Sequence, residues 1–222
     1  MDKIIPVINV KTSKDFFATL GRLGNYTGWV QIDVADGKFT NWKNFSDPSK
    51  INDKQMPSKN SARYLFELHL MVRDSSEVIA KWLHVKPKRI IVPVEVKNNL
   101  ESLTLWAKET KGEVGLSVNP DTLNSTVLEQ LKLYGNDINV LLLLGVKPGP
   151  SGQEFDPTIL ERVRYFHKLY PKIKIEVDGG VNEENVKSIF KAGASIVAVG
   201  SAIFERQEKP LARIKMLEEL IA

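Results

Sequence analysis

Eight short apolar runs, separated by amphipathic stretches, constrain the fold more than any other feature of the sequence. A run of four to eight apolar residues bounded by turn residues is typical of a buried strand, and apolar residues at helical spacing predict covering helices. Strands that alternate with helices pair in parallel through right-handed crossovers. The predicted strands are residues 4–8, 29–34, 66–71, 89–96, 113–118, 139–146, 173–178 and 195–200. The predicted helices lie near residues 13–23, 58–66, 75–84, 98–111, 124–134, 156–170, 182–192 and 208–221.

Eight strand–helix units in 222 residues predict a single-domain (β/α)8 TIM barrel over residues 1–222. An open, doubly wound sheet is the alternative. It would use fewer strands and often a glycine-rich first turn, whereas the PVINVK that ends the first predicted strand has no G-x-G-x-x-G pattern. The polar stretch 40–59 is predicted to be a long loop over the end of the second strand.

Composition excludes several kinds of site. The chain has no cysteine, which excludes disulfides, thiolate metal sites and a thiol nucleophile. No run approaches the roughly 20 apolar residues of a membrane helix, and the start MDKIIPVINV lacks a signal-peptide pattern, so a cytoplasmic location is expected. The net charge of +4 comes from scattered basic residues, which predicts a solvated surface and no nucleic-acid partner.

Polar side chains occur on three predicted strands where a barrel of this kind carries its chemistry. Gln31 and Asp33 share one face of the second strand, because side chains alternate between faces, and the intervening apolar residues take the other. His69 lies on the third strand and Asp178 ends the seventh. Reacting groups lie at the C-terminal ends of barrel strands, so these side chains should meet at one mouth. Asp, His and Asp suit a divalent metal such as zinc, manganese or iron, and two facing carboxylates suit proton transfer.

Each of these signals also has an ordinary structural explanation. A lone His on a strand is more often a satisfied core or rim residue than a ligand, and an Asp before Gly-Gly is more often a turn residue than a catalyst. Their shared position at strand ends is what favours a site. Glu67 and Glu176 lie on the same strand faces, so several carboxylates are expected to converge on the mouth.

Three glycine-rich turns follow the last three predicted strands, at residues 147–153, 178–182 and 199–204. Glycines let backbone N–H groups approach a ligand closely, and barrels of this class often hold a phosphate in the loops after strands 7 and 8. Ordinary turn chemistry explains any one of these loops better than it explains all three. The candidate phosphate-binding residues are Gly149, Ser151, Gly152, Gly179, Gly180, Gly200 and Ser201.

The segments ELHLMV, KPGPSGQ-EF, IEVDGGVN and AVGSAIF together resemble the ribulose-phosphate 3-epimerase family, over nearly the whole chain from Ile5 to about Phe204. The resemblance implies a carbohydrate isomerase of the pentose phosphate pathway. Such an enzyme epimerises carbon 3 of a phosphorylated ketopentose, such as ribulose 5-phosphate, through a metal-stabilised enediolate. Carried over residue by residue, the resemblance implies that Asp33 and Asp178 are the acid/base pair and that His69 joins them as a metal ligand.

The chain departs from the family pattern at several positions. The family's second-strand motif resembles H-x-D-x-M-D-G-x-F, so Gln31 replaces a His ligand and Ala35 replaces a Met. Val7 stands where the family carries a substrate-contacting Ser, and Lys147 where it carries an Asn. A neutral amide is a much poorer ligand than imidazole for a zinc-like ion, so Gln31 is a doubtful fourth ligand and any metal is expected to bind weakly.

These departures leave three functions open: an epimerase, a different isomerase or lyase of a phosphorylated ketose, and a diverged or non-catalytic sugar-phosphate-binding homologue. The retained Asp33 and Asp178 favour an enzyme. The orotidine-monophosphate-decarboxylase branch is disfavoured, because its D-x-K-x-x-D pattern needs a Lys in register near Ala35. The expected partners are a phosphorylated sugar and copies of the chain in a homo-oligomer, with neither nucleic acid nor a membrane.

Overall fold

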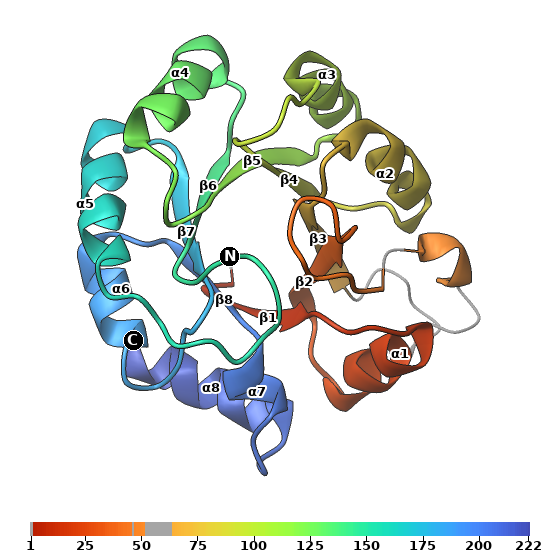
Figure 1. Ribbon diagram of the computed structural model, residues 1–222. Coiled ribbons are helices and arrows are strands. Elements are labelled where there is room, and N and C mark those ends of the chain that lie inside the picture. The colour runs from red at the N-terminus through yellow and green to blue at the C-terminus, as the bar shows by residue number, and fades with distance from the viewer. Residues whose placement is uncertain (1, 46, 52–63) are drawn as a thin grey trace.

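The structure, a computed structural model, describes residues 2–45, 47–51 and 64–222. Eight parallel strands close into a barrel in chain order, and the helices form an outer ring (Figure 1). The strands are β1 (Ile4–Ile8), β2 (Gly28–Ala35), β3 (Tyr64–Met71), β4 (Arg89–Pro93), β5 (Glu113–Val118), β6 (Val140–Leu144), β7 (Lys174–Asp178) and β8 (Ile196–Val199). The helices are α1 (Ser13–Arg22), α2 (Ser75–Trp82), α3 (Leu100–Thr110), α4 (Asn124–Tyr134), α5 (Ile159–Leu169), α6 (Val186–Ala192), α7 (Ser201–Phe204) and α8 (Pro210–Leu220), with 3-10 turns η1 (Pro48–Lys50) and η3 (Leu83–Val85).

The predicted (β/α)8 barrel is confirmed, but one predicted helix is wrong where it can be judged. Of the helix predicted near residues 58–66, residues 58–63 lie outside the described residues and 64–66 open β3. β3 pairs with β2 along its whole length, from Gly28 beside Tyr64 to Ala35 beside Met71. A short apolar run fits the spacing of either a helix or a strand. Here it forms a strand, because it pairs with β2. Of the predicted loop 40–59, residues 40–45 and 47–51 are described, and among them the only helix or strand is the 3-10 turn η1.

Alternation along the strands explains why an amide and a carboxylate stand side by side on β2. Val30, Ile32 and Val34 face outward and pack in the large apolar layer beneath the helices. Gln31 and Asp33 therefore face the barrel interior, where both are buried. The apolar residues of β7 also face outward, since Ile175 and Val177 lie in the same outer layer.

A buried ion cluster fills the interior below the mouth. Arg89 forms ion pairs through Nη1 with Glu67 and, at 3.2 Å, with Glu176, and through Nη2 with Glu113 at 2.7 Å. Its guanidinium lies 4.2 Å from the ring centroid of Trp29. The expectation that Glu67 and Glu176 converge on the mouth is therefore wrong. Each lies two residues before a mouth residue on its strand, which places it one inward layer deeper.

The mouth of the barrel lies at the C-terminal strand ends, where the loops after β6, β7 and β8 gather (Figure 1). The helix α7 directly follows β8 and begins at Ser201. Among the helices that the structure describes, none combines the length and the apolar character that crossing a membrane requires.

Candidate active site

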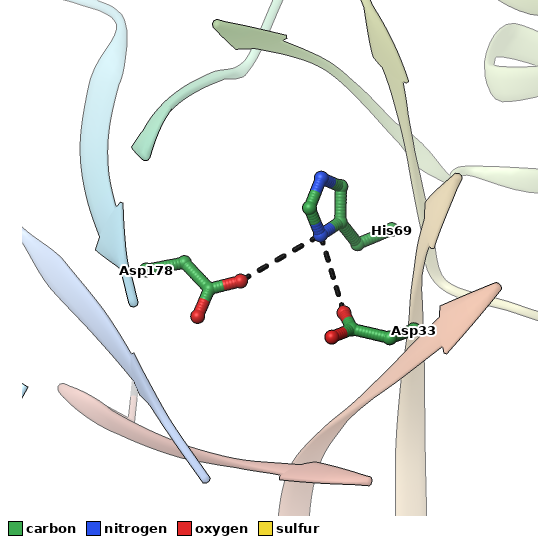
Figure 2. Close-up of side chains that lie close together, drawn as sticks. All are labelled: Asp33, His69 and Asp178. Atoms are coloured by element: carbon green, nitrogen blue, oxygen red, sulfur yellow. Dashed lines mark hydrogen bonds and ion pairs between the residues drawn. The ribbon is translucent and has the colours of Figure 1, made fainter. Parts of the chain in front are cut away.

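Three of the predicted site residues meet at the mouth. Asp33 and His69 are neighbours because β2 and β3 pair in the register that sets them side by side. Asp178 approaches from the end of β7 across the barrel (Figure 2). The Nδ1 atom of His69 lies 3.2 Å from Oδ1 of Asp33 and 3.6 Å from Oδ2 of Asp178. All three residues are buried, so the charges interact in a poorly hydrated space.

Gln31 lies between the two carboxylates. Its Nε2 donates to Oδ1 of Asp33 at 2.8 Å and to Oδ2 of Asp178 at 2.8 Å. Its Oε1 is buried and has no hydrogen-bond partner among the described residues. The amide therefore uses both of its hydrogens to hold the two carboxylates together.

Burial and the nearby charges shift the acid–base behaviour of this group. Burial, followed by the negative charge of Asp33, raises the pKa of Asp178 to about 7, against the opposing effects of His69 and the Gln31 hydrogen bond. Burial disfavours the imidazolium form of His69, but the hydrogen bond and charge of Asp33 and the charge of Asp178 outweigh it and raise the pKa of His69. Asp178 can thus gain or lose a proton near neutral pH.

The donor set fits a divalent metal. One ligand atom each of Asp33, His69 and Asp178 all lie within 4.8 Å of one another. Two carboxylates and an imidazole are the ligand types that zinc, manganese and iron accept. Gln31 would have to turn its amide over to offer its partnerless oxygen, and the amide orientation follows from the hydrogen bonds it makes. Three residues are therefore ready to hold a metal, and Gln31 is not oriented as the fourth.

A single pocket at the mouth brings the predicted phosphate residues together with the carboxylates. Asp33, His69 and Asp178 line its floor. All seven candidate phosphate residues also line it: Gly149, Ser151, Gly152, Gly179, Gly180, Gly200 and Ser201. The three turns that the sequence singled out separately thus border one cavity.

The turn after β7 requires its two glycines. Gly179 and Gly180 have φ values of +97° and +70°, in the region that favours glycine. A Cβ on Gly180 would lie 2.6 Å from the backbone of Phe155. The carbonyl of Gly180 accepts a hydrogen bond from the side chain of Asn185 at 2.9 Å, which fixes the turn.

The residues that depart from the family pattern have different surroundings in the structure. Val7 lines the pocket as an apolar side chain. Ala35 is fully buried, and its backbone N–H donates to Oδ1 of Asn44 at 2.8 Å. Lys147 lines the rim, and its exposed Nζ lies 3.7 Å from Asp121.

Sequence reasoning missed a polar network beside Asp33. Asn9 donates from Nδ2 to Oδ2 of Asp33 at 3.0 Å, and Asn44 donates from Nδ2 to the backbone oxygen of Asp33 at 2.8 Å. Trp42 joins them through its indole N–H, which donates to Asn9 at 3.1 Å. The inward position of Asn9 could have been predicted, because Ile5, Val7 and Asn9 are two residues apart and so share one face of a strand. The positions of Trp42 and Asn44 could not have been predicted, because they lie in an irregular polar stretch with no strand or helix spacing.

The barrel is similar in fold to solved structures of distant sequence. KGPDC from Streptococcus mutans aligns with a TM-score of 0.69 at 11% identity, covering 100% of this chain and 97% of the other. The 3-hexulose-6-phosphate synthase from Salmonella typhimurium aligns with a TM-score of 0.69 at 14% identity, covering 99% and 98%. At these identities the likeness shows the fold alone.

Sequence relatives carry the comparison further. A ribulose-phosphate 3-epimerase from Aquifex aeolicus is 34% identical over 181 residues, which cover 79% of this chain and 77% of the relative. Another from Schizosaccharomyces pombe is 26% identical over 206 residues, covering 92% and 88%. The profile of the "Ribulose-phosphate 3 epimerase family" matches residues 10–204. The chain therefore belongs to the ribulose-phosphate 3-epimerase family.

Proposed function

We propose that this chain epimerises carbon 3 of a phosphorylated ketopentose such as ribulose 5-phosphate, with Asp33 and Asp178 as the acid/base pair. The observation that carries the proposal is the placement of these carboxylates on opposite walls of one mouth (Figure 2). Gln31 and His69 join them. Inversion at one carbon needs a base on one face and an acid on the other. The whole chain, residues 1–222, acts as one domain in this account.

The proton moves between the two faces of the substrate. One ionised carboxylate removes the proton from carbon 3. The electron pair of the broken C–H bond forms a double bond between carbons 2 and 3, and the π pair of the carbonyl moves onto its oxygen to give an enediolate. The opposite, protonated carboxyl then delivers its proton to the other face of carbon 3 as the carbonyl re-forms. The pKa of about 7 for Asp178 suits this exchange, because the group can gain or lose a proton near neutral pH. After one turnover the proton has passed from one carboxyl to the other, and exchange with water resets the pair.

The glycine-rich turns are assigned to the phosphate of the substrate. Backbone N–H groups of the turns after β7 and β8, at Gly179, Gly180, Gly200 and Ser201, are the proposed donors. Gly149, Ser151 and Gly152 close the same pocket from the β6 side. Binding the phosphate at this rim anchors the substrate while its carbon 3 lies between the carboxylates.

Asp33, His69 and Asp178 are the residues that would hold a divalent metal. Such an ion, when bound, supplies a Lewis acid that stabilises negative charge on the substrate oxygens. Its binding is proposed to be weak, because Gln31 offers hydrogens and not an oxygen toward the site.

A non-catalytic sugar-phosphate-binding role is the alternative, and one observation favours it. Val7 presents an apolar side chain to the pocket where the family pattern has a hydroxyl, so one substrate contact is lost. The retained pair Asp33 and Asp178 weighs against this alternative, because binding alone does not require two buried carboxylates at close range.

A direct assay separates the two functions. Wild-type protein is incubated with ribulose 5-phosphate, and the carbon-3 epimer is quantified with and without added zinc, manganese or iron. Epimerisation is expected, and Asp33→Asn and Asp178→Asn should each lower it by about 10²- to 10⁴-fold. The surface variant Asp137→Asn is the matched control and should retain activity. A wild-type protein that binds the sugar phosphate without epimerising it would support the binding role instead.

The remaining expectations stay predictions. A homo-oligomer, a cytoplasmic location and the absence of nucleic-acid partners follow from the sequence analysis. One relative, from Oryza sativa, is named as a cytoplasmic isoform and is 30% identical over 188 residues, which cover 84% of this chain and 79% of the relative.

A further inference from the structure

Asn9 is a polar residue at the pocket that the proposed reaction has not yet used. It directly follows β1 and makes four hydrogen bonds through its side chain. Its Nδ2 donates to Oδ2 of Asp33 at 3.0 Å and to the carbonyl of Gly149 at 3.1 Å. Its Oδ1 accepts from Nε1 of Trp42 at 3.1 Å and from Nδ2 of Asn44 at 3.0 Å.

These partners fix the orientation of the Asn9 amide. An indole N–H can only donate, so the atom of Asn9 that faces Trp42 must be the oxygen. The NH2 group must then face Asp33 and Gly149, both of which present acceptors. Two donors and two acceptors satisfy the full capacity of the amide, which holds it rigidly in this position.

The two oxygens of Asp33 have separate partners as a result. Oδ1 faces Gln31 and His69, on the side of the opposite carboxylate. Oδ2 accepts from Asn9 on the side of the β6 loop. The same NH2 group that holds Asp33 also holds Gly149, in the glycine-rich loop of residues 147–153.

We propose that Asn9 is a positioning residue, whose NH2 group orients Asp33 for proton transfer and ties the loop of residues 147–153 to the pocket. The first half of this inference rests on the proposed acid/base role of Asp33. The second half rests only on the contact with Gly149. Partners that orient a functional group are typically worth about 10- to 100-fold in activity or affinity.

Two variants separate the donor contacts of Asn9 from its acceptor contacts. Asn9→Asp keeps an oxygen for Trp42 and Asn44 but replaces the NH2 group with a second oxygen. Asn9→Ala removes all four contacts. The exposed residue Asn136 provides the matched control, Asn136→Ala. All variants are measured at pH 8, well above the ordinary aspartate pKa of about 3.9.

Deuterium wash-in at carbon 3, starting separately from ribulose 5-phosphate and from its epimer, reports on each carboxylate. Both Asn9 variants are expected to slow wash-in about 10- to 100-fold from the epimer whose proton Asp33 removes. At saturating substrate, where weaker phosphate binding does not limit the rate, wash-in from the epimer whose proton Asp178 removes should stay near the wild-type rate. A general loss of structure would slow both equally and would overturn the assignment of Asn9 to Asp33.

Backbone hydrogen exchange gives a reading that does not depend on activity. In Asn9→Asp, exchange should become faster in residues 147–153 but not in residues 42–45, and in Asn9→Ala it should become faster in both. Wild-type exchange of residues 147–153 in Asn9→Asp would overturn the tie to the loop. If the wild-type protein itself exchanges no carbon-3 proton, the proposed reaction and the orienting role fail together, and hydrogen exchange still decides the tie to the loop.

Discussion

Gln31 gives the site a neutral bridge where the family pattern has a metal-binding imidazole. Its two amide hydrogens reach both carboxylates, so Gln31 helps His69 to hold the pair at close range. A metal that used Gln31 as a ligand would have to compete with these hydrogen bonds. The amide must break both of them before it can turn its oxygen toward the carboxylates. Hydrogen bonds to charged groups contribute about 1.5–3 kcal/mol each, which is enough to weaken metal binding by orders of magnitude.

The substitution Gln31→His should convert the mouth into a tight transition-metal site. It adds an imidazole to Asp33, His69 and Asp178, which completes a four-ligand set, and it removes the competing amide hydrogens. Affinity for zinc or manganese is expected to rise by at least about 100-fold, as measured by isothermal titration. The variant Gln31→Leu, which offers no ligand, is the control and should not gain affinity. Tight binding by the unmodified protein would mean that Gln31 already serves as a full ligand.

The pH dependence of activity should report the carboxyl pair. Epimerisation needs one proton on the pair, and the pKa of Asp178 is raised to about 7 by burial and by the charge of Asp33. As pH rises through about 7 the pair loses that proton, so kcat/KM of the metal-free protein should fall by up to about tenfold per pH unit above it. Initial rates from pH 5 to 9 in a chelator test this. A kcat/KM that keeps rising to pH 9 would remove Asp178 as a proton carrier.

At the level of elements, the turns after β7 and β8 differ in how much substitution they tolerate. Gly180 has a positive φ, and a Cβ there would collide with the backbone of Phe155, so its replacement would disturb the fold as well as the pocket. A Cβ on Gly200 would meet nothing closer than Ser151 Oγ at 3.7 Å and Val7 Cβ at 3.8 Å. Gly200 is therefore the cleaner position for testing the phosphate site.

The substitution Gly200→Leu should block the anion pocket while leaving the barrel folded. Its side chain would project toward Ser151 and Val7, which line the pocket. Thermal protection of the wild-type protein by phosphate or ribulose 5-phosphate is expected to disappear in the variant, while the melting temperature without ligand changes little. Gly21→Leu serves as the control, because a Cβ on Gly21 would meet nothing within 4 Å. Full protection in Gly200→Leu would locate the phosphate elsewhere.

The sequence predicted the barrel and the strand-end residues for a common reason. Alternation on β2 and β7 sets the inward face, and strand ends set the mouth, so Asp33 and Asp178 follow from local pattern alone. The bridge that Gln31 makes could not be predicted, because it depends on a distance across the barrel. The depth of Glu67 and Glu176 was misjudged, since the pattern gives the face of a strand but not the partner, Arg89, that holds both side chains below the mouth.

At the scale of the whole molecule, the site rests on the ion cluster inside the barrel. Arg89 is the only cation that the described residues place against Glu67 and Glu176, and all three are fully buried. Burial, followed by the charge of Glu67, raises the pKa of Glu176 well above its usual range. Glu67 and Glu176 each lie one inward layer below a site residue on the same strand, His69 on β3 and Asp178 on β7. The ion cluster therefore stabilises the strands that position these two site residues.

Removing the arginine should destabilise the entire barrel. Arg89→Met leaves two carboxyl groups buried without their cation, which typically costs about 3–5 kcal/mol of unfolding free energy. In a protein of this size the melting temperature should fall by roughly 10 °C, measured by calorimetry. The triple variant Arg89→Met, Glu67→Gln, Glu176→Gln removes the stranded charges and should recover much of the loss. A single variant as stable as wild type would show that the cluster contributes little.

Barrels of this shape host many chemistries, so the fold does not decide the reaction. The central claim is that Asp33 and Asp178 address opposite faces of one carbon. Proton exchange at that carbon follows from this claim and from no property of the barrel as a whole.

Deuterium wash-in at carbon 3 of ribulose 5-phosphate, followed in heavy water with and without added metals, is the most direct test. The account predicts that the wild-type protein incorporates deuterium at carbon 3 as it epimerises. Asp33→Asn and Asp178→Asn should each lower epimerisation by about 10²- to 10⁴-fold but retain wash-in from one epimer, a different one for each variant. Absence of wash-in by the wild-type protein under every metal condition, or wash-in from the same epimer in both variants, would contradict it.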